Sequence, residues 1–300
     1  MHYLYPEKLK VGDTIGLVTP SSPMMTGRLE LGISYLERNG YKAKVGAHVH
    51  DTNRFMAGLD EDRAKDIMDF FLDPSVKAIM ATGGGYSSQR ILPLLDYDVI
   101  RKNPKWVIGF SDTTALQLGI LSRAGIASCT GFTFRDLEEN PLDSLIEKTL
   151  KSCLLGEAYQ IEEGVPIIPG IVEGPLVGGN LGSLMALIGT PFQPNFKESI
   201  LLIEEVWSEP YKIDSMFSQL ELAGIFKQIK GLIFGQFERC AAEHFPERDG
   251  TSDDIINEWS ERIGVPCIKE FPYGHRNRRC VLPIGKKVKL DAERAILYIF

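Results

Sequence analysis

The first half of the chain alternates short apolar runs, rich in β-branched residues, with stretches whose apolar residues recur at helical spacing. Residues 14–19 and 76–81 are two of these runs, and each predicts a buried strand. Between them, Leu29, Ile33 and Leu36 lie on one face of a predicted helix. Strands that alternate with helices in this way predict βαβ units. We therefore expect an α/β fold with a doubly wound, mostly parallel, Rossmann-like sheet.

The second half differs from the first in composition and in its predicted elements. Residues 156–174 are rich in glycine, proline and glutamate, which favours a turn-rich linker after an N-terminal domain of residues 1–155. Residues 175–300 predict a second, smaller mixed α/β domain. Its expected elements are a turn at Gly178-Gly179-Asn180, strands at 200–204, 231–235, 265–269, 287–290 and 295–299, and a helix at about 211–223.

Composition and charge narrow the class of function. Hydrophobic residues make up 44% and charged residues 24% of the 300 residues, as is usual for a globular protein. The formal net charge is −7 and neither half is basic, which disfavours binding to nucleic acid or to an anionic membrane. A small substrate fits this composition better than a polymer.

Neither the N-terminus nor the cysteines suggest export. The first residues lack the pattern of a signal peptide, and the longest uncharged run, 174–196, is broken by prolines and glycines, so we expect no membrane span. The cysteines are odd in number, widely spaced and without a Cys-x-x-Cys pair, which predicts free thiols in a reducing, cytoplasmic compartment. They are Cys129, Cys153, Cys240, Cys267 and Cys280.

Ser111 directly follows the predicted buried strand 106–110 and precedes a predicted helix. A serine in such a turn lies at the carboxyl edge of the sheet, beside a helix N-terminus that favours negative charge. The local pattern resembles a nucleophile elbow but lacks its last glycine, because Thr113 stands there. Serine is also a favoured N-cap, so the local sequence leaves both a nucleophile and a simple cap open.

A run of glycines, Gly83-Gly84-Gly85, follows another predicted strand. Glycines at this position allow backbone N–H groups to approach a ligand, as in an oxyanion hole. The run lacks the spacing of nucleotide-binding fingerprints. A tight turn that requires positive φ remains an equal alternative.

Two further patterns offer ionisable side chains. His275 lies in a loop rich in proline and glycine, and Glu204 and Glu205 end an apolar strand, where alternation sends one inward and leaves the other solvated. His48, His50 and Asp51 suggest metal ligands on one strand face, but no carboxylate or histidine follows them at a metal-like spacing, so we expect a solvated loop.

Serine, glutamate and histidine together supply the nucleophile, orienting acid and base of a hydrolase triad. The alternative from another class is a non-catalytic α/β module that binds a small ligand, in which Ser111 only caps its helix.

The chain as a whole resembles the LD-carboxypeptidases, serine peptidases of murein recycling, and the related microcin C self-immunity peptidases. The similarity extends over nearly the whole chain and is specific because many blocks occur in the same order. The blocks that carry it are residues 9–21, 57–64, 84–96, 104–115, 178–184, 189–191, 201–205, 210–214, 274–275 and 282–285.

The resemblance implies a Ser–Glu–His triad that spans two domains, on a fold like that of class I glutamine amidotransferases. The family's nucleophile falls on Ser111, its acid on Glu204 with Glu205 as the adjacent alternative, and its histidine on His275. The family requires neither a metal nor an organic cofactor, acts on small peptides and forms homodimers.

The family's oxyanion hole uses two backbone N–H groups, which fall on Asp112 and Gly85. Residues near the same turn and near the histidine are the candidates for substrate binding. They are Gly84, Tyr86, Arg90 and Arg276.

The glycine turn departs from the usual carboxypeptidase pattern Arg-Gly-Gly-Tyr-Gly. Gly83 replaces the arginine and Ser87 the last glycine, which is more like the microcin-immunity branch. The resemblance still implies release of C-terminal D-alanine from an LD-peptide, a murein tetrapeptide, because the Gly-Gly-Asn block, the Gly-Thr-Pro block and the short length fit the carboxypeptidases. It leaves cleavage of an aminoacyl-nucleotide amide as the alternative.

Overall fold

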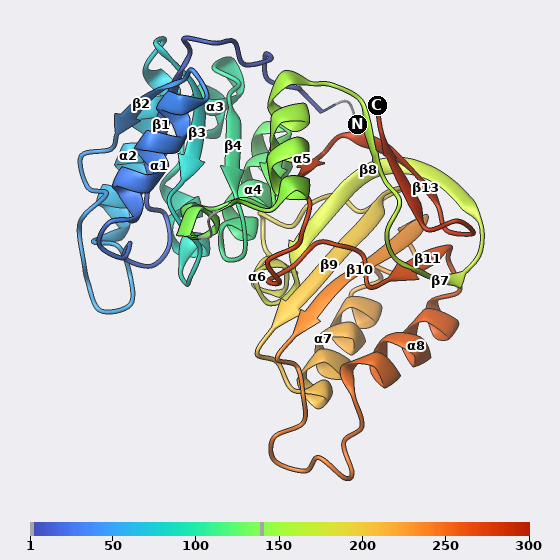
Figure 1. Cartoon of the computed structure of the whole chain (residues 1–300). Helices are drawn as coiled ribbons and strands as arrows, with labels where there is room; N and C mark the ends of the chain where they lie inside the picture. Colours follow the sequence, from blue (N-terminus) through green and yellow to red (C-terminus); the bar gives the residue numbers. More distant parts are fainter. Residues whose placement is uncertain (1–2, 139–140) are drawn as a thin grey trace.

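The computed structural model describes residues 3–138 and 141–300, which form two sheets surrounded by helices (Figure 1). The first sheet has the strand order β12-β5-β4-β3-β1-β2, and all its pairs are parallel except β12 with β5. Its strands are β1 (Thr14–Val18), β2 (Lys42–Val45), β3 (Val76–Ala81), β4 (Trp106–Gly109), β5 (Ser128–Thr130) and β12 (Leu282–Ile284).

Helices cover both faces of this sheet, which confirms the doubly wound arrangement. Ile15 and Leu17 of β1 pack in one hydrophobic cluster with α1 and α5, whereas Val18 packs in another with α2, α3 and α4. The alternation of side chains along a strand explains this division. The helices are α1 (Arg28–Arg38), α2 (Asp60–Leu72), α3 (Tyr97–Lys102), α4 (Thr113–Ala124) and α5 (Ser144–Leu155), with 3₁₀ turns η1 (Ser88–Leu94) and η2 (Phe134–Glu138).

The second sheet is mixed, as expected, with the order β6-β14-β13-β8-β9-β10-β11-β7. Its central strands β8 to β11 are parallel, and antiparallel strands flank them. The strands are β6 (Tyr159–Ile161), β7 (Val165–Ile168), β8 (Ile171–Asn180), β9 (Ile200–Val206), β10 (Gly231–Glu238), β11 (Cys267–Lys269), β13 (Lys287–Asp291) and β14 (Ile296–Ile299). The accompanying helices are α6 (Leu181–Met185), α7 (Pro210–Leu222) and α8 (Ser252–Ile263).

Two local expectations in this half are wrong. Residues 156–174 contain β6, β7 and the start of β8, so the expected linker is largely part of the sheet. Gly178 and Gly179 lie within β8, which ends at Asn180, and do not form a turn. Glycine is required there by close approach, because a Cβ on Gly178 would lie 1.9 Å from the carbonyl oxygen of Leu202. The division into domains at residues 155 and 175 stays a prediction, and β12 returns from the C-terminal part to the first sheet.

The cysteine expectation is also wrong for one pair. Cys129 on β5 and Cys153 on α5 form a disulfide, although 24 residues separate them in sequence, because α5 packs against β5. Cys240, Cys267 and Cys280 are free and buried. The cysteines therefore no longer support a reducing compartment.

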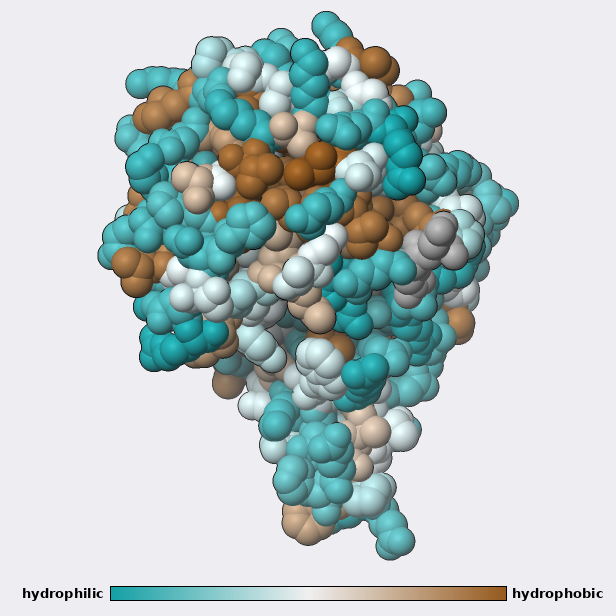
Figure 2. Space-filling model, turned by 60° about the vertical axis from the view of Figure 1, so that its left-hand side comes forward, coloured by the Kyte–Doolittle hydropathy of each residue, from teal (hydrophilic) through white to brown (hydrophobic). Residues whose placement is uncertain are grey.

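The surface has one marked projection. The loop of residues 239–251, between β10 and α8, extends lowest in Figure 1 and forms the narrow, mostly hydrophilic tip in Figure 2. Among the described residues, no helix combines the length and the apolar character needed to cross a membrane.

Candidate active site

Ser111 lies at the sharp turn between β4 and α4. Its φ of +63° is a strained conformation for a residue other than glycine, and such strain concentrates at functional sites. The N-cap of α4 is Asp112 and the helix begins at Thr113. Ser111 is therefore not the cap, and the capping interpretation of this serine is wrong.

The glycine turn packs directly against this serine. An ideal Cβ on Gly84 would lie 2.9 Å from Cβ and 3.3 Å from Oγ of Ser111, so only glycine fits without a shift. Gly85 has a φ of +123°, and Ser22 accepts a hydrogen bond from the N–H of Tyr86 at 3.1 Å. The next residue, Ser87, has a φ of +84°, which explains why a glycine suits this position in the family pattern.

Gly85 and Asp112, whose backbone N–H groups are the candidates for the oxyanion hole, both line the cavity that contains Ser111. Within residues 3–138 and 141–300, neither N–H donates a hydrogen bond to a protein acceptor. Ser88 fixes the turn beside them, because its N–H donates to the Asp112 carboxylate at 2.9 Å and its hydroxyl to the Asp112 carbonyl at 2.6 Å. Burial raises the pKa of the Asp112 carboxyl.

His275 connects Ser111 to an acid on the second sheet. Its Nε2 lies 3.0 Å from Oγ of Ser111, and its Nδ1 lies 2.7 Å from Oε2 of Glu204. The ring packs against Phe110, the residue before the serine, with centroids 4.7 Å apart. These distances allow the imidazole to take a proton from the serine while the carboxylate holds its other nitrogen.

The loop that carries His275 is anchored on both sheets. Gly274 approaches β10 so closely that a Cβ there would lie 2.6 Å from Cβ of Gln236. Tyr273 is fully buried and its hydroxyl lies 2.8 Å from Oγ1 of Thr130 on β5. The imidazole is therefore positioned by rigid elements and not by a free loop.

Glu204 and Glu205 point to opposite faces of β9, as alternation predicts, but neither is solvated. Glu204 is completely buried, and Glu205 is 4% exposed and accepts hydrogen bonds from the N–H groups of Gly182 and Val206, each at 2.8 Å. Burial, and secondarily the charge of Glu204, raises the pKa of Glu205. The expectation that one acid is solvated is thus wrong.

Asn180 is a site residue that the sequence analysis did not single out. Its Nδ2 donates to Oε1 of Glu204 at 3.1 Å, while its Oδ1 caps α6 by accepting from the N–H of Ser183 at 3.0 Å. Its own N–H donates to Oγ1 of Thr114 on α4, at 3.1 Å. Asn180 ends the Gly-Gly-Asn block, and this position at the end of a strand was the signal.

Ser111, His275, Asn180 and the glycine turn line a cavity of about 910 Å³, which lies where the edges of the two sheets meet. Gly84 and Tyr86 also line it, as expected for substrate-binding residues. Arg90 does not line it and is engaged by Asp60 at 2.6 Å, and Arg276 lines an adjoining pocket and pairs with Glu238 at 3.0 Å. The structure therefore gives no support to Arg90 as a substrate-binding residue.

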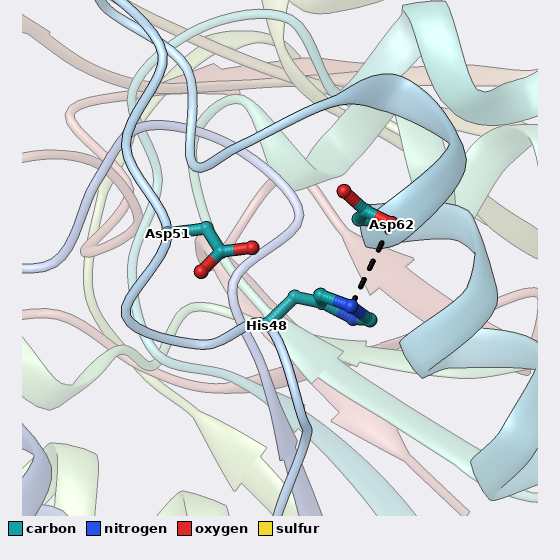
Figure 3. A group of neighbouring side chains, drawn as sticks. All are labelled: His48, Asp51 and Asp62. Carbon is teal, nitrogen blue, oxygen red and sulfur yellow. Dashed lines mark ion pairs between the residues drawn. The ribbon is translucent and has the colours of Figure 1, made fainter.

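A second cluster of ionisable groups lies away from this cavity (Figure 3). Candidate ligand atoms of His48, Asp51 and Asp62 lie within 4.8 Å of one another, and Nδ1 of His48 lies 2.9 Å from Oδ1 of buried Asp66. The hydrogen bond with Asp66 is the main cause of the raised pKa of His48. Sequence spacing missed Asp62 and Asp66, because the fold of α2 brings these two acids to His48 from further along the chain, and His50 is not part of the cluster.

Comparisons with known proteins agree along the chain. Residues 15–131 match the LD-carboxypeptidase N-terminal domain and residues 173–290 match the LD-carboxypeptidase C-terminal domain. A Synechocystis protein named as a carboxypeptidase is 33% identical over 99% of this chain and 97% of its own length. The murein tetrapeptide carboxypeptidase of Pseudomonas aeruginosa is 28% identical over 95% of each chain.

A solved structure is similarly close. The microcin C7 self-immunity protein, in complex with aspartyl sulfamoyl adenosine, superposes with a TM-score of 0.90 at 27% identity, covering 99% of this chain and 98% of that one.

Proposed function

The chain belongs to the LD-carboxypeptidase family, and from this premise we propose that it is a serine peptidase that releases C-terminal D-alanine from an LD-tetrapeptide of murein. The observation that carries the proposal is the continuous contact from Ser111 through His275 to Glu204. A ligand-binding module has no use for a serine held in a strained turn against a base.

In the proposed mechanism, Ser111 attacks the carbonyl carbon of the penultimate residue while Nε2 of His275 accepts the hydroxyl proton. The N–H groups of Asp112 and Gly85 stabilise the oxyanion. His275 then protonates the leaving nitrogen, and D-alanine departs. Water, deprotonated by the same imidazole, hydrolyses the acyl-enzyme and returns the serine. Throughout, Glu204 holds the imidazole tautomer and stabilises its charged form.

The second candidate is a peptidase that cleaves an aminoacyl-nucleotide amide. It is favoured by the similarity to the microcin C7 self-immunity protein and by Gly83, which brings no cation to the glycine turn. The reaction chemistry would be the same, and only the leaving group would differ. We rank it second because the glycine turn is the single local feature of the sequence that favours it.

A hydrolysis panel tests the two candidates. The wild-type protein is incubated with LD-tetrapeptides, with their DD-isomers as controls, and with an aspartyl amide of an adenosine nucleotide, and products are separated by mass spectrometry. We expect free D-alanine from the LD-tetrapeptides alone. Rapid cleavage of the nucleotide amide without D-alanine release would establish the second candidate. Labelling by a fluorophosphonate, lost in Ser111→Ala, separates either enzyme from a binding module.

We also propose a homodimer in the cytoplasm. The family resemblance supports the dimer, and an exposed band of hydrophobic residues crosses the upper half of the face in Figure 2, where a second copy would find apolar surface. Light scattering of the purified protein and cell fractionation test the two parts separately. Disulfides are rare in cytoplasmic proteins, so the Cys129–Cys153 disulfide argues against a cytoplasmic location. Cell fractionation is therefore the more informative of the two measurements.

A further inference from the structure

A smaller pocket of about 370 Å³ adjoins the cavity of Ser111, and the two share His275, Trp207 and Arg135. Ser111, Gly85 and the other groups of the oxyanion turn line only the larger cavity. The small pocket, which we call the side pocket, therefore lies on the histidine side of the serine. In a serine peptidase the histidine protonates the leaving nitrogen, so the leaving residue lies beside the imidazole.

The side pocket differs from the main cavity in charge. Arg135, Arg239 and Arg276 line it together with a single carboxylate, Glu238. Glu238 pairs with Arg276 at 3.0 Å, and the guanidinium of Arg239 lies over the ring of Trp207, 5.7 Å from its centroid. The pocket thus holds an excess of positive charge, which favours an anionic group.

Apart from Arg135, the arginines of the described chain that line the main cavity are already paired with carboxylates. Arg28 pairs with Glu138 at 2.6 Å and Arg279 pairs with Asp136. In contrast, no carboxylate in residues 3–138 or 141–300 lies within ion-pair distance of Arg135, which is exposed on η2. Arg135 is also the only arginine in the described chain that lines both the main cavity and the side pocket.

Trp207 forms one wall of the side pocket. It is 60% exposed and has a φ of +62°, an uncommon conformation for a bulky residue. A backbone hydrogen bond from its N–H to the carbonyl of Glu238, 3.1 Å long, holds it. The side pocket thus has a large aromatic ring as one of its walls.

We propose that the side pocket is the leaving-residue subsite and that Arg135 binds the C-terminal carboxylate of the substrate, with Arg239 as a weaker second cation. The inference rests on the proposed function, whose leaving group is a single residue with a free carboxylate. This ion pair would restrict the enzyme to the last residue of a peptide. A peptide that extends beyond the leaving residue, or that ends in a neutral group, offers Arg135 no carboxylate.

The test uses one LD-tetrapeptide in two forms, with a free C-terminal carboxylate and as the C-terminal amide. We expect the wild type to prefer the acid by about 10- to 100-fold in kcat/KM, the range of one charge-assisted contact. Arg135→Gln should lower kcat/KM for the acid by the same factor, mainly through KM, and leave the amide within about twofold. Arg90→Gln, which removes an arginine outside both pockets, is the matched control.

Binding by calorimetry in the Ser111→Ala background gives an independent measurement. The acid should bind more tightly than the amide, and Arg135→Gln should remove the difference. If the wild type hydrolyses neither peptide, the proposed function fails, and this binding comparison still decides the subsite. Equal losses on acid and amide in Arg135→Gln, no loss, or no preference of the serine variant for the acid would overturn the inference.

Discussion

The two edges that meet at the active-site cavity contribute different kinds of structure. The edge of the first sheet contributes backbone geometry, in the strained turn of Ser111 and the glycines packed against it. The edge of the second sheet contributes side chains, because Glu204 and Asn180 form a buried hydrogen-bonded pair on β9 and β8, and His275 completes it.

This difference predicts how substitutions at each edge lower the activity. On the first sheet a substitution acts by displacing atoms, so that even one added methyl group matters where space is absent. On the second sheet a substitution acts through charge, so that an isosteric change is enough. The two edges are joined at α4, where Thr114 accepts the hydrogen bond from Asn180, and they should therefore act as one unit in catalysis.

The largest expected effect comes from removing one group on each side. Ser111→Ala and His275→Ala should each lower kcat/KM by roughly 10⁴-fold or more, and the double variant should be hardly worse than either, because members of a triad act together. Steady-state D-alanine release measures all three proteins. Thermal melting of each variant shows that the loss does not come from unfolding.

Losses that multiply in the double variant would contradict the view that the two edges form one unit. Normal activity in Ser111→Ala would remove this serine from the mechanism altogether.

The next effect separates two neighbouring acids on the second sheet. Glu204→Gln should lower kcat by roughly 10³- to 10⁴-fold, because the imidazole loses its charged partner while the shape of the site is kept. Glu205→Gln should lower kcat only about 5- to 10-fold, because the amide NH₂ replaces one carboxylate oxygen and cannot accept the hydrogen bond from a backbone N–H. The same kinetic assay compares both variants, and the reverse order would assign the orienting role to Glu205.

The pH dependence of stability gives a second measurement on this pair. The pKa of Glu205 is raised from 4.5 by burial, so the folded protein holds this proton more tightly than the unfolded chain does. The free energy of unfolding should then fall as pH rises from about 4.5 through the raised pKa. Glu205→Gln carries no such proton and should make this decline shallower in urea titrations between about pH 4 and 7. An unchanged slope would show that another group causes it.

Sequence periodicity predicted most of the fold because the strands of both sheets are apolar runs with clear ends. The predicted strand 14–19 is β1, and the predicted helix 211–223 is α7, each within one residue at either end. Periodicity failed at residues 156–174, where prolines and glycines lie within strands. Of these strands, β6 and β7 form the two edges of the second sheet, where proline is tolerated, whereas β8 is a central strand.

The sequence predicted those site residues whose type and position match a local motif. Ser111, Glu204 and His275 follow from motifs, and the structure brings them together as expected. Arg135 carries no local signal, because its role depends on which carboxylates reach it from other elements. The disulfide of Cys129 and Cys153 was missed for the same reason, since pairing is a property of packing and not of spacing.

An effect smaller than that of Glu204→Gln tests the backbone character of the first edge with two adjacent glycines. A Cβ on Gly84 would lie 3.1 Å from the carbonyl oxygen of Phe110 as well as against Ser111, so Gly84→Ala must displace the nucleophile or the turn. A Cβ on Gly83 meets nothing within 4 Å, and this residue does not have a positive φ. Both glycines line the cavity, so the pair differs mainly in available space.

We expect Gly84→Ala to lower kcat by up to about 10²-fold, the cost of a displacement near 1 Å at a reacting atom, with little change in melting temperature. Gly83→Ala should stay within about twofold of the wild type, as substitutions in open space do. Single-turnover rates of acyl-enzyme formation, measured with an active ester, isolate the attack of Ser111 from product release. Equal effects of the two substitutions would mean that the glycine turn does not position the serine. The first edge would then contribute side-chain chemistry alone, as the second edge does.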